Sequence, residues 1–83
     1  MNKLSTDKAP AAIGPYSQGV EVQGLVFTSG QIPINPAVGK IEAEGIEAQA
    51  EQSCKNVEAV LEAAGLSMND VVKTTCLLAN MED

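Results

Sequence analysis

The 83-residue sequence contains no histidine, no arginine and no tryptophan, and it has a single tyrosine and a single phenylalanine. Without histidine there is no Ser–His or Cys–His nucleophile pair and no imidazole metal ligand. The net charge is −6 and the five lysines are scattered, which argues against nucleic acid or an anionic membrane as a partner. The glycines do not fit a dinucleotide-binding fingerprint. We therefore expect no metal and no cofactor.

The two cysteines, Cys54 and Cys76, are too few for a disulfide framework and lack metal-ligand spacing. Cys54 falls on the apolar stripe of a predicted helix and Cys76 falls within a predicted strand. We expect both to be packed as small hydrophobic residues. No apolar run approaches the length of a signal sequence or a membrane span. These features predict a protein of the reducing cytoplasm.

Four segments carry the secondary-structure prediction. Residues 17–31 alternate like a hairpin around a Gln23-Gly24 turn, and residues 32–45 form a long loop. A helix is expected from residue 46, with Gly65 as its C-terminal cap and a Glu51–Lys55 pair on its surface. Its apolar stripe comprises Ile46, Ala50, Cys54, Val57, Leu61 and Ala64. Residues 71–78 follow as a strand, so the chain is a single α+β domain of order ββαβ.

The predicted strand, "VVKTTCLL", is apolar on both of its faces. One helix can cover one face of a sheet, so the other face needs a second cover, and a neighbouring subunit is the simplest candidate. A chain this short also buries only roughly 60–65% of its unfolded surface. We expect one set of strand residues to be buried only against another chain, either Val71 and Leu77 or Val72, Cys76 and Leu78.

The candidate site consists of two short segments, "GPYSQG" and "SGQIP". The only tyrosine, Tyr16, stands in a turn after Pro15 rather than in an apolar run. Gly30 at the end of a strand would let a ligand approach the backbone, and Ser29 and Gln31 add a hydroxyl and an amide. Taken alone, each segment also fits a purely structural turn.

Three blocks together resemble a known family. They are "APAAIGPYSQG" (residues 9–19), "FTSGQIPINPAVGKI" (residues 27–41) and "QSCKNVEAVLEAAGLSMNDVVKTTCLLANM" (residues 52–81). This pattern is similar to the Rid family, also called YjgF or reactive intermediate deaminases. The resemblance implies a chorismate-mutase-like fold with helices on one face of a mixed sheet. It also implies a homotrimer with ligand clefts between subunits.

The resemblance further implies a reaction. Members of the deaminase branch hydrolyse imines and enamines, such as 2-aminoacrylate, to 2-oxo acids and ammonia. Tyr16 would match the pocket tyrosine as the catalytic residue, and Ser29, Gly30 and Gln31 would line the ligand-binding cleft. The tyrosine would then stand in a turn because its hydroxyl faces a shared, partly wet cavity.

The sequence departs from the family pattern in one respect. The family's carboxylate-binding arginine and water-positioning glutamate lie in C-terminal segments that have no counterpart in these 83 residues. A non-catalytic module that binds small 2-oxo acids is therefore an alternative to the deaminase. Ribonuclease activity, a label often attached to the family, is disfavoured by the net charge.

The end of the sequence, "ANMED", has the pattern of a helix start. Asn80 stands where an N-cap belongs, and Glu82 and Asp83 suit a first helical turn. Three strands and one helix are also too few to cover the sheet. We therefore predict that the domain is C-terminally truncated, with a second helix and further strands in the longer product.

Overall fold

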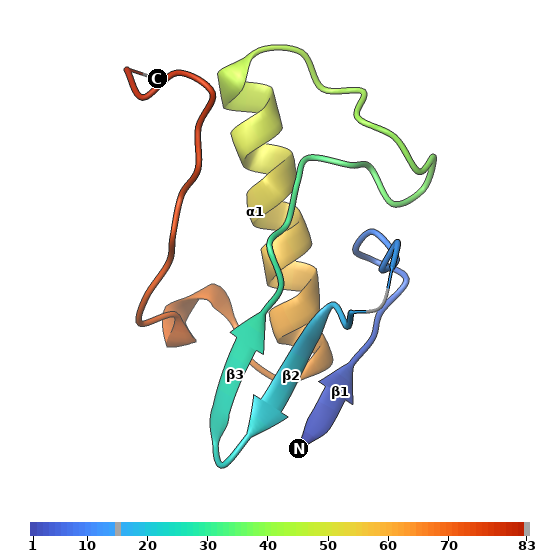
Figure 1. Ribbon diagram of the computed structural model, residues 1–83, viewed down its shortest axis with the longest axis vertical. Coiled ribbons are helices and arrows are strands. Elements are labelled where there is room, and N and C mark those ends of the chain that lie inside the picture. Colours follow the sequence, from blue (N-terminus) through green and yellow to red (C-terminus); the bar gives the residue numbers. More distant parts are fainter. Residues whose placement is uncertain (15, 83) are drawn as a thin grey trace.

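The computed structural model describes residues 1–14 and 16–82, and it confirms the predicted α+β class (Figure 1). A small sheet lies against one long helix. The elements in chain order are β1 (Asn2–Leu4), β2 (Gly19–Val22), β3 (Leu25–Thr28), α1 (Ile46–Ala63) and a 3-10 helix, η1 (Met68–Asp70).

The sheet is antiparallel, in the order β1-β2-β3. The predicted hairpin is confirmed: Val22 pairs with Leu25 across a two-residue turn, and Gln23 and Gly24 have φ of 49° and 80°. Two successive positive φ values match the right-handed twist of the flanking strands. β1 was not expected, because Asn2–Leu4 is too short to show an alternating pattern. It pairs with β2 so that Leu4 lies opposite Gly19.

The helix α1 ends as predicted. The Gly65 N–H donates to the Glu62 carbonyl and the Leu66 N–H to the Leu61 carbonyl, each at 2.9 Å, while Gly65 has a φ of 78°. These two bonds satisfy carbonyls that the last helical turn leaves without partners. The Glu51–Lys55 pair is also present, at 3.5 Å on the exposed surface. No helix within residues 1–14 and 16–82 is both long and apolar enough to cross a bilayer.

The buried face of α1 differs from the predicted apolar stripe. Its buried residues are Asn56, Ala59, Val60 and Leu61. Cys54, which was expected to pack inside, is exposed, and so is Cys76. The helix has apolar side chains on two adjacent faces, and the sheet covers the face centred on Val60. The prediction that both cysteines are packed is therefore wrong.

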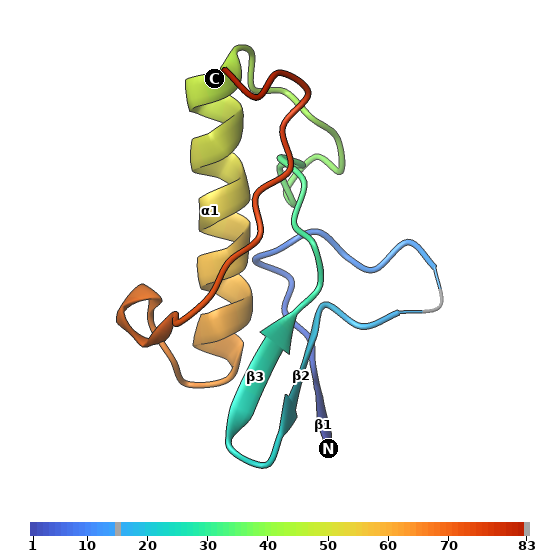
Figure 2. The ribbon, with the colours of Figure 1, turned by 60° about the vertical axis from the view of Figure 1, so that its left-hand side comes forward.

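Residues 71–78 were predicted to be a strand, and the structure does not form one there. They run as an extended segment beside α1, back toward the helix N-terminal end (Figures 1 and 2). Val72 and Leu77 are 95% and 90% exposed. Strand-like composition forms a strand only where a hydrogen-bonding partner is available, and this segment pairs with no strand of the described residues. At the end of the described residues Asn80 Oδ1 accepts a hydrogen bond from the Glu82 N–H at 3.0 Å, and residues 81–82 form a turn there. Asp83 lies outside the described residues.

The core is small and lies between α1 and the sheet. Val60 is fully buried, Ala9 and Ala59 pack with it, and Leu4 of β1 contributes at the edge. Gly19 of β2 lies directly against Val60 and Leu4. This contact sets how closely helix and sheet approach. The antiparallel pairing of β2 with β3 places the chain before β2 and the chain after β3 at the same end of the sheet (Figure 1).

Candidate functional site

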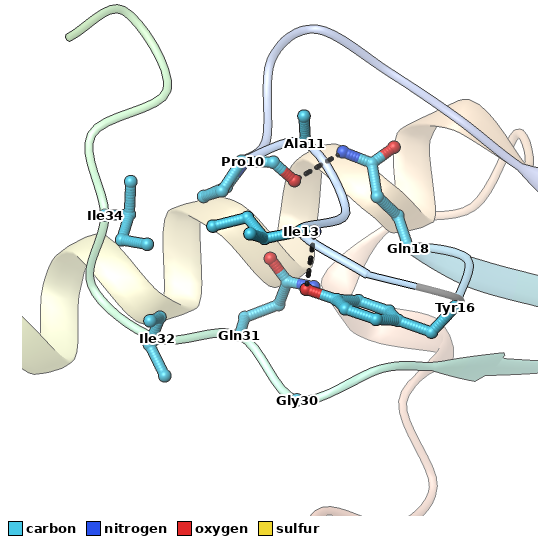
Figure 3. Close-up of a pocket in the computed structure, with 9 residues that line it drawn as sticks. All are labelled: Pro10, Ala11, Ile13, Tyr16, Gln18, Gly30, Gln31, Ile32 and Ile34. Carbon is cyan, nitrogen blue, oxygen red and sulfur yellow. Dashed lines mark hydrogen bonds between the residues drawn. The ribbon is translucent and has the colours of Figure 1, made fainter. Parts of the chain in front are cut away.

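A small hollow lies where the segment before β2 meets the segment after β3 (Figure 3). Its volume is about 40 Å³, which leaves room for water. The hollow brings together three of the four predicted site residues, Tyr16, Gly30 and Gln31. The lining residues are Pro10, Ala11, Ile13, Tyr16, Gln18, Gly30, Gln31, Ile32 and Ile34.

Tyr16 lies at the open side of this hollow, with 52% of its surface exposed. Its backbone N–H donates to the Gly14 carbonyl at 2.8 Å, which closes a tight turn. Its hydroxyl accepts a long hydrogen bond, 3.5 Å, from the Ile13 N–H (Figure 3). That bond leaves the phenol proton available to a ligand, since the hydroxyl acts there only as an acceptor. Pro15, the preceding residue in the "GPYSQG" segment, lies outside the described residues.

Ser29, the fourth predicted site residue, is not among the residues that line this hollow. Its hydroxyl donates to the Ser17 carbonyl, and its N–H donates to the Gln18 carbonyl at 3.0 Å. Both bonds run from the end of β3 to the chain entering β2. In this structure, Ser29 therefore ties together the two segments that frame the site.

Gly30 and Gln31 occupy the opposite wall. No atom lies within 4 Å of the point where a Cβ on Gly30 would stand. The backbone there is open to an approaching molecule, as the sequence suggested. Gln31 is half-buried, and its side-chain Nε2 donates to the Ser29 carbonyl at 3.2 Å.

Sequence reasoning missed Gln18, which lines the hollow from within and is only 5% exposed. Its Oε1 accepts from the Thr6 N–H at 2.7 Å, and its Nε2 donates to the carbonyls of Thr6, Ala9 and Pro10 at 2.9, 3.2 and 2.7 Å. One side chain thus fixes the chain between Thr6 and Pro10. No local pattern indicates this role, because the partners are backbone groups 8 to 12 positions away.

Asn56 of α1 is the second buried amide that was missed, with 1% exposure. Its Nδ2 donates to the carbonyls of Ile32 and Ile34 at 3.0 and 2.9 Å. The signal available in the sequence was a polar residue close to the apolar positions of the helix. Gln18 and Asn56 therefore hold the two walls of the hollow in place.

The chemistry offered by these side chains is hydrogen bonding at an apolar surface. A phenol and two amides face isoleucine, proline and alanine side chains, and none of the lining residues carries a charge. Within the part of the chain that the structure describes, no three His, Cys, Asp or Glu side chains gather as metal ligands would. Such an arrangement suits a small ligand with a few polar atoms and a short alkyl group.

The sequence was compared with known protein families and curated proteins. A family model described as Endoribonuclease L-PSP matches residues 6–83. The 2-iminobutanoate/2-iminopropanoate deaminase of Escherichia coli K12 is 51% identical over 80 residues, which are 96% of this chain and 62% of that protein. The chain thus spans less than two thirds of the length of this relative.

Solved structures of the same family are also similar to this chain. The putative endoribonuclease L-PSP of Entamoeba histolytica superposes with a TM-score of 0.94 at 44% identity, over 99% of this chain and 66% of that one. E. coli TdcF with bound serine gives a TM-score of 0.82 at 49% identity, over 87% and 56%. These neighbours have the chorismate-mutase-like fold that the resemblance implied. The chain belongs to the Rid/YjgF family, which the matching family model describes as Endoribonuclease L-PSP.

Proposed function

We propose that the protein is an enzyme that hydrolyses reactive 2-imines and 2-enamines, such as 2-aminoacrylate. An enamine first tautomerises to the imine, as a proton moves from the nitrogen to the β-carbon. A water molecule then adds across the C=N bond, and collapse of the adduct breaks the C–N bond and releases ammonia and a 2-oxo acid. The observation that carries the proposal is the identity of 51% with a protein named as a deaminase of 2-iminobutanoate and 2-iminopropanoate. The meeting of Tyr16, Gly30 and Gln31 at one hollow supports it.

An imine carbon is already electrophilic, so its hydrolysis needs little catalytic machinery. Positioning the water and stabilising the developing charge on nitrogen are sufficient roles for neutral hydrogen-bonding groups. In this proposal the Tyr16 hydroxyl contacts the reacting nitrogen or the attacking water. The open backbone at Gly30 and the Gln31 amide then receive the remaining polar atoms of the substrate.

The small volume of the hollow favours a site completed by a second subunit. About 40 Å³ is well below the roughly 300–1,000 Å³ of typical ligand pockets, and half of the Tyr16 surface remains open. Val72 and Leu77 also present large apolar side chains to solvent. An apolar surface of this kind is typical of an interface between chains.

We therefore expect the natural protein to be a homotrimer with its clefts between subunits, as the family resemblance implies. Multi-angle light scattering at micromolar concentration should report three times the chain mass. A monomer at that concentration would contradict both the family analogy and the interpretation of the exposed apolar residues.

The activity itself is tested with a coupled assay on the complete natural protein. A pyridoxal-phosphate-dependent dehydratase supplies 2-aminoacrylate from serine, and pyruvate release is followed with and without the protein. The proposal requires faster release when the protein is present. Release at the uncatalysed rate with imines from several amino acids would reject it.

Tyr16→Phe should lower kcat/KM by about 10- to 100-fold, the range typical of losing one positioned hydroxyl in the transition state. The melting temperature should change little, because Tyr16 is half-exposed and the hydrogen bond to its hydroxyl is long. Thermal unfolding and the coupled assay on the same preparation check both parts. A large fall in melting temperature with full activity would instead assign Tyr16 a structural role.

A binding module for small 2-oxo acids is the second candidate. The structure of E. coli TdcF with bound serine favours this candidate. It shows a relative at 49% identity that binds a small amino acid, and binding alone does not require catalysis. Isothermal titration calorimetry with pyruvate and 2-oxobutanoate separates the two candidates. Binding without acceleration in the coupled assay would select the binding module.

A further inference from the structure

Asn56 does not touch the hollow, yet it fixes the two residues that form one apolar wall of it. We infer that Asn56 is a positioning residue that acts through Ile32 and Ile34, and so controls which substrate side chain the site accepts. The inference rests on the proposed function, because it concerns the selectivity of the same site. It concerns the alkyl group of the substrate and not the reacting C=N bond.

The contacts of Asn56 are complete and directional. Both carbonyls that it contacts require donors, so the amide nitrogen faces Ile32 and Ile34, while its Oδ1 accepts from Gln52 Nε2 at 3.0 Å. All polar atoms of the Asn56 side chain are therefore bonded, at 1% exposure. A buried amide with every bond made has one orientation, and it holds its partners in one place.

Among the residues that the structure describes, the other hydrogen bond of Ile32 and Ile34 lies within the wall itself. The Ile34 N–H donates to the Ile32 carbonyl at 2.8 Å, which makes a tight turn around Pro33. This turn shapes the segment internally, but it does not attach the segment to the rest of the protein. The bonds from Asn56 attach it to α1, 22 and 24 residues away in the sequence.

Ile32 and Ile34 both line the hollow, on the side away from Tyr16 (Figure 3). A substrate that places its C=N bond at Tyr16 would direct its alkyl group toward these side chains. An apolar wall discriminates between substrates by the room it leaves for each methylene group. A wall free to move would discriminate less, so the position of the turn sets the selectivity.

The experiment compares two imines that differ by one methylene, 2-iminopropanoate and 2-iminobutanoate, with the complete natural protein. Asn56→Ser removes both bonds to the wall, and Gln52→Ala removes only the bond that orients Asn56. Gln49→Ala is the matched control, because Gln49 lies on the same helix and donates to a carbonyl of the same loop, Ala43, at 3.1 Å. Ala43 does not line the hollow.

For Asn56→Ser we expect the ratio of the two kcat/KM values to change by about 3- to 10-fold from the wild-type ratio. Gln52→Ala should shift the ratio in the same direction by less, and Gln49→Ala should leave it within about twofold. A purely structural role would lower the melting temperature and scale both rates equally. Only a change in the ratio of the two kcat/KM values would show that the position of the Ile32 and Ile34 wall has changed.

A double-mutant cycle with Ile34→Val shows whether Asn56 acts through the wall. If it does, the effects of Asn56→Ser and Ile34→Val on the ratio should be non-additive. An unchanged ratio in folded Asn56→Ser protein overturns the inference, as does strict additivity. If Asn56→Ser does not fold, an unchanged ratio in Gln52→Ala overturns it instead. Failure of the proposed function is distinct, because the wild-type protein would then turn over neither imine.

Discussion

Gln18→Ala should lower the free energy of unfolding by about 2–4 kcal/mol, the range expected when several buried hydrogen bonds lose one partner together. The substitution removes the acceptor for the Thr6 N–H and the donor for three carbonyls, those of Thr6, Ala9 and Pro10. Water can replace some of these bonds at Thr6 and Pro10, which are only partly buried. Ala9 is 2% exposed, and its carbonyl has no easy substitute.

The same change should weaken the site. Pro10 and Ala11 line the hollow directly after the segment that Gln18 holds. Once that segment is free, one wall loses its fixed distance from Gly30 and Gln31. We therefore expect lower kcat/KM for imines of every size, in contrast to the size-dependent effect expected at Asn56.

Gln18→Glu separates the contribution of hydrogen bonding from that of packing at residue 18, and Gln49→Ala is the control. Gln18→Glu keeps the size of the side chain and one oxygen for the Thr6 N–H, but it places a second oxygen against three carbonyl oxygens. It should destabilise the protein as strongly as alanine does. Gln49→Ala, which removes a single bond on the half-buried face of α1, should cost less than about 1 kcal/mol. Urea unfolding of all three proteins would contradict the interpretation if Gln18→Glu were as stable as the wild type.

Local sequence signals predicted the elements that depend on local bonds. The hairpin turn follows from Gln23-Gly24, because this turn type needs two successive positive φ values. The end of α1 follows from Gly65 and Leu66, whose N–H groups return to the last helical carbonyls. These bonds join residues five or fewer positions apart, so a single stretch of sequence contains all the information.

The features that were missed depend on distant partners. β1 forms because it pairs with β2, with Leu4 opposite Gly19. Residues 71–78 form no strand because no described strand pairs with them. The buried face of α1 was misplaced because two faces of the helix are apolar. Only the position of the sheet decides that Val60 is covered and Cys54 is exposed.

The site also has some residues that local sequence indicates and others that depend on distant partners. The sequence indicated Tyr16, Gly30 and Gln31 from their unusual positions in turns, and the structure brings these three to one hollow. Ser29 was grouped with them for its hydroxyl beside Gly30 and from the family resemblance, and in this structure that hydroxyl donates to the Ser17 carbonyl. Gln18 and Asn56 escaped notice because an amide that bonds to distant carbonyls looks, in sequence, like any polar residue.

Gly19→Ala should destabilise the protein by about 2–3 kcal/mol, within the range for overpacking a tight contact. An added Cβ would stand 3.0 Å from the Phe27 carbonyl oxygen, 3.0 Å from Val60 Cγ1 and 3.2 Å from Leu4 Cδ1. Gly19 is thus the point where β1, β3 and α1 all meet β2. The Phe27 oxygen belongs to the paired backbone of β3 and cannot move alone, so the helix or the neighbouring strand must shift.

The double variant Gly19→Ala, Val60→Ala tests this cause, because removing the Val60 methyl groups relieves one of the three contacts. The loss of stability should be smaller than the sum of the two single losses. Gly30→Ala is the control for stability: no atom lies within 4 Å of its Cβ position, so the midpoint of urea unfolding should stay near the wild-type value. Equal unfolding midpoints for Gly19→Ala and Gly30→Ala would mean that helix and sheet do not meet at Gly19. Additive losses in the double variant would exclude Val60 as the group that resists the added methyl.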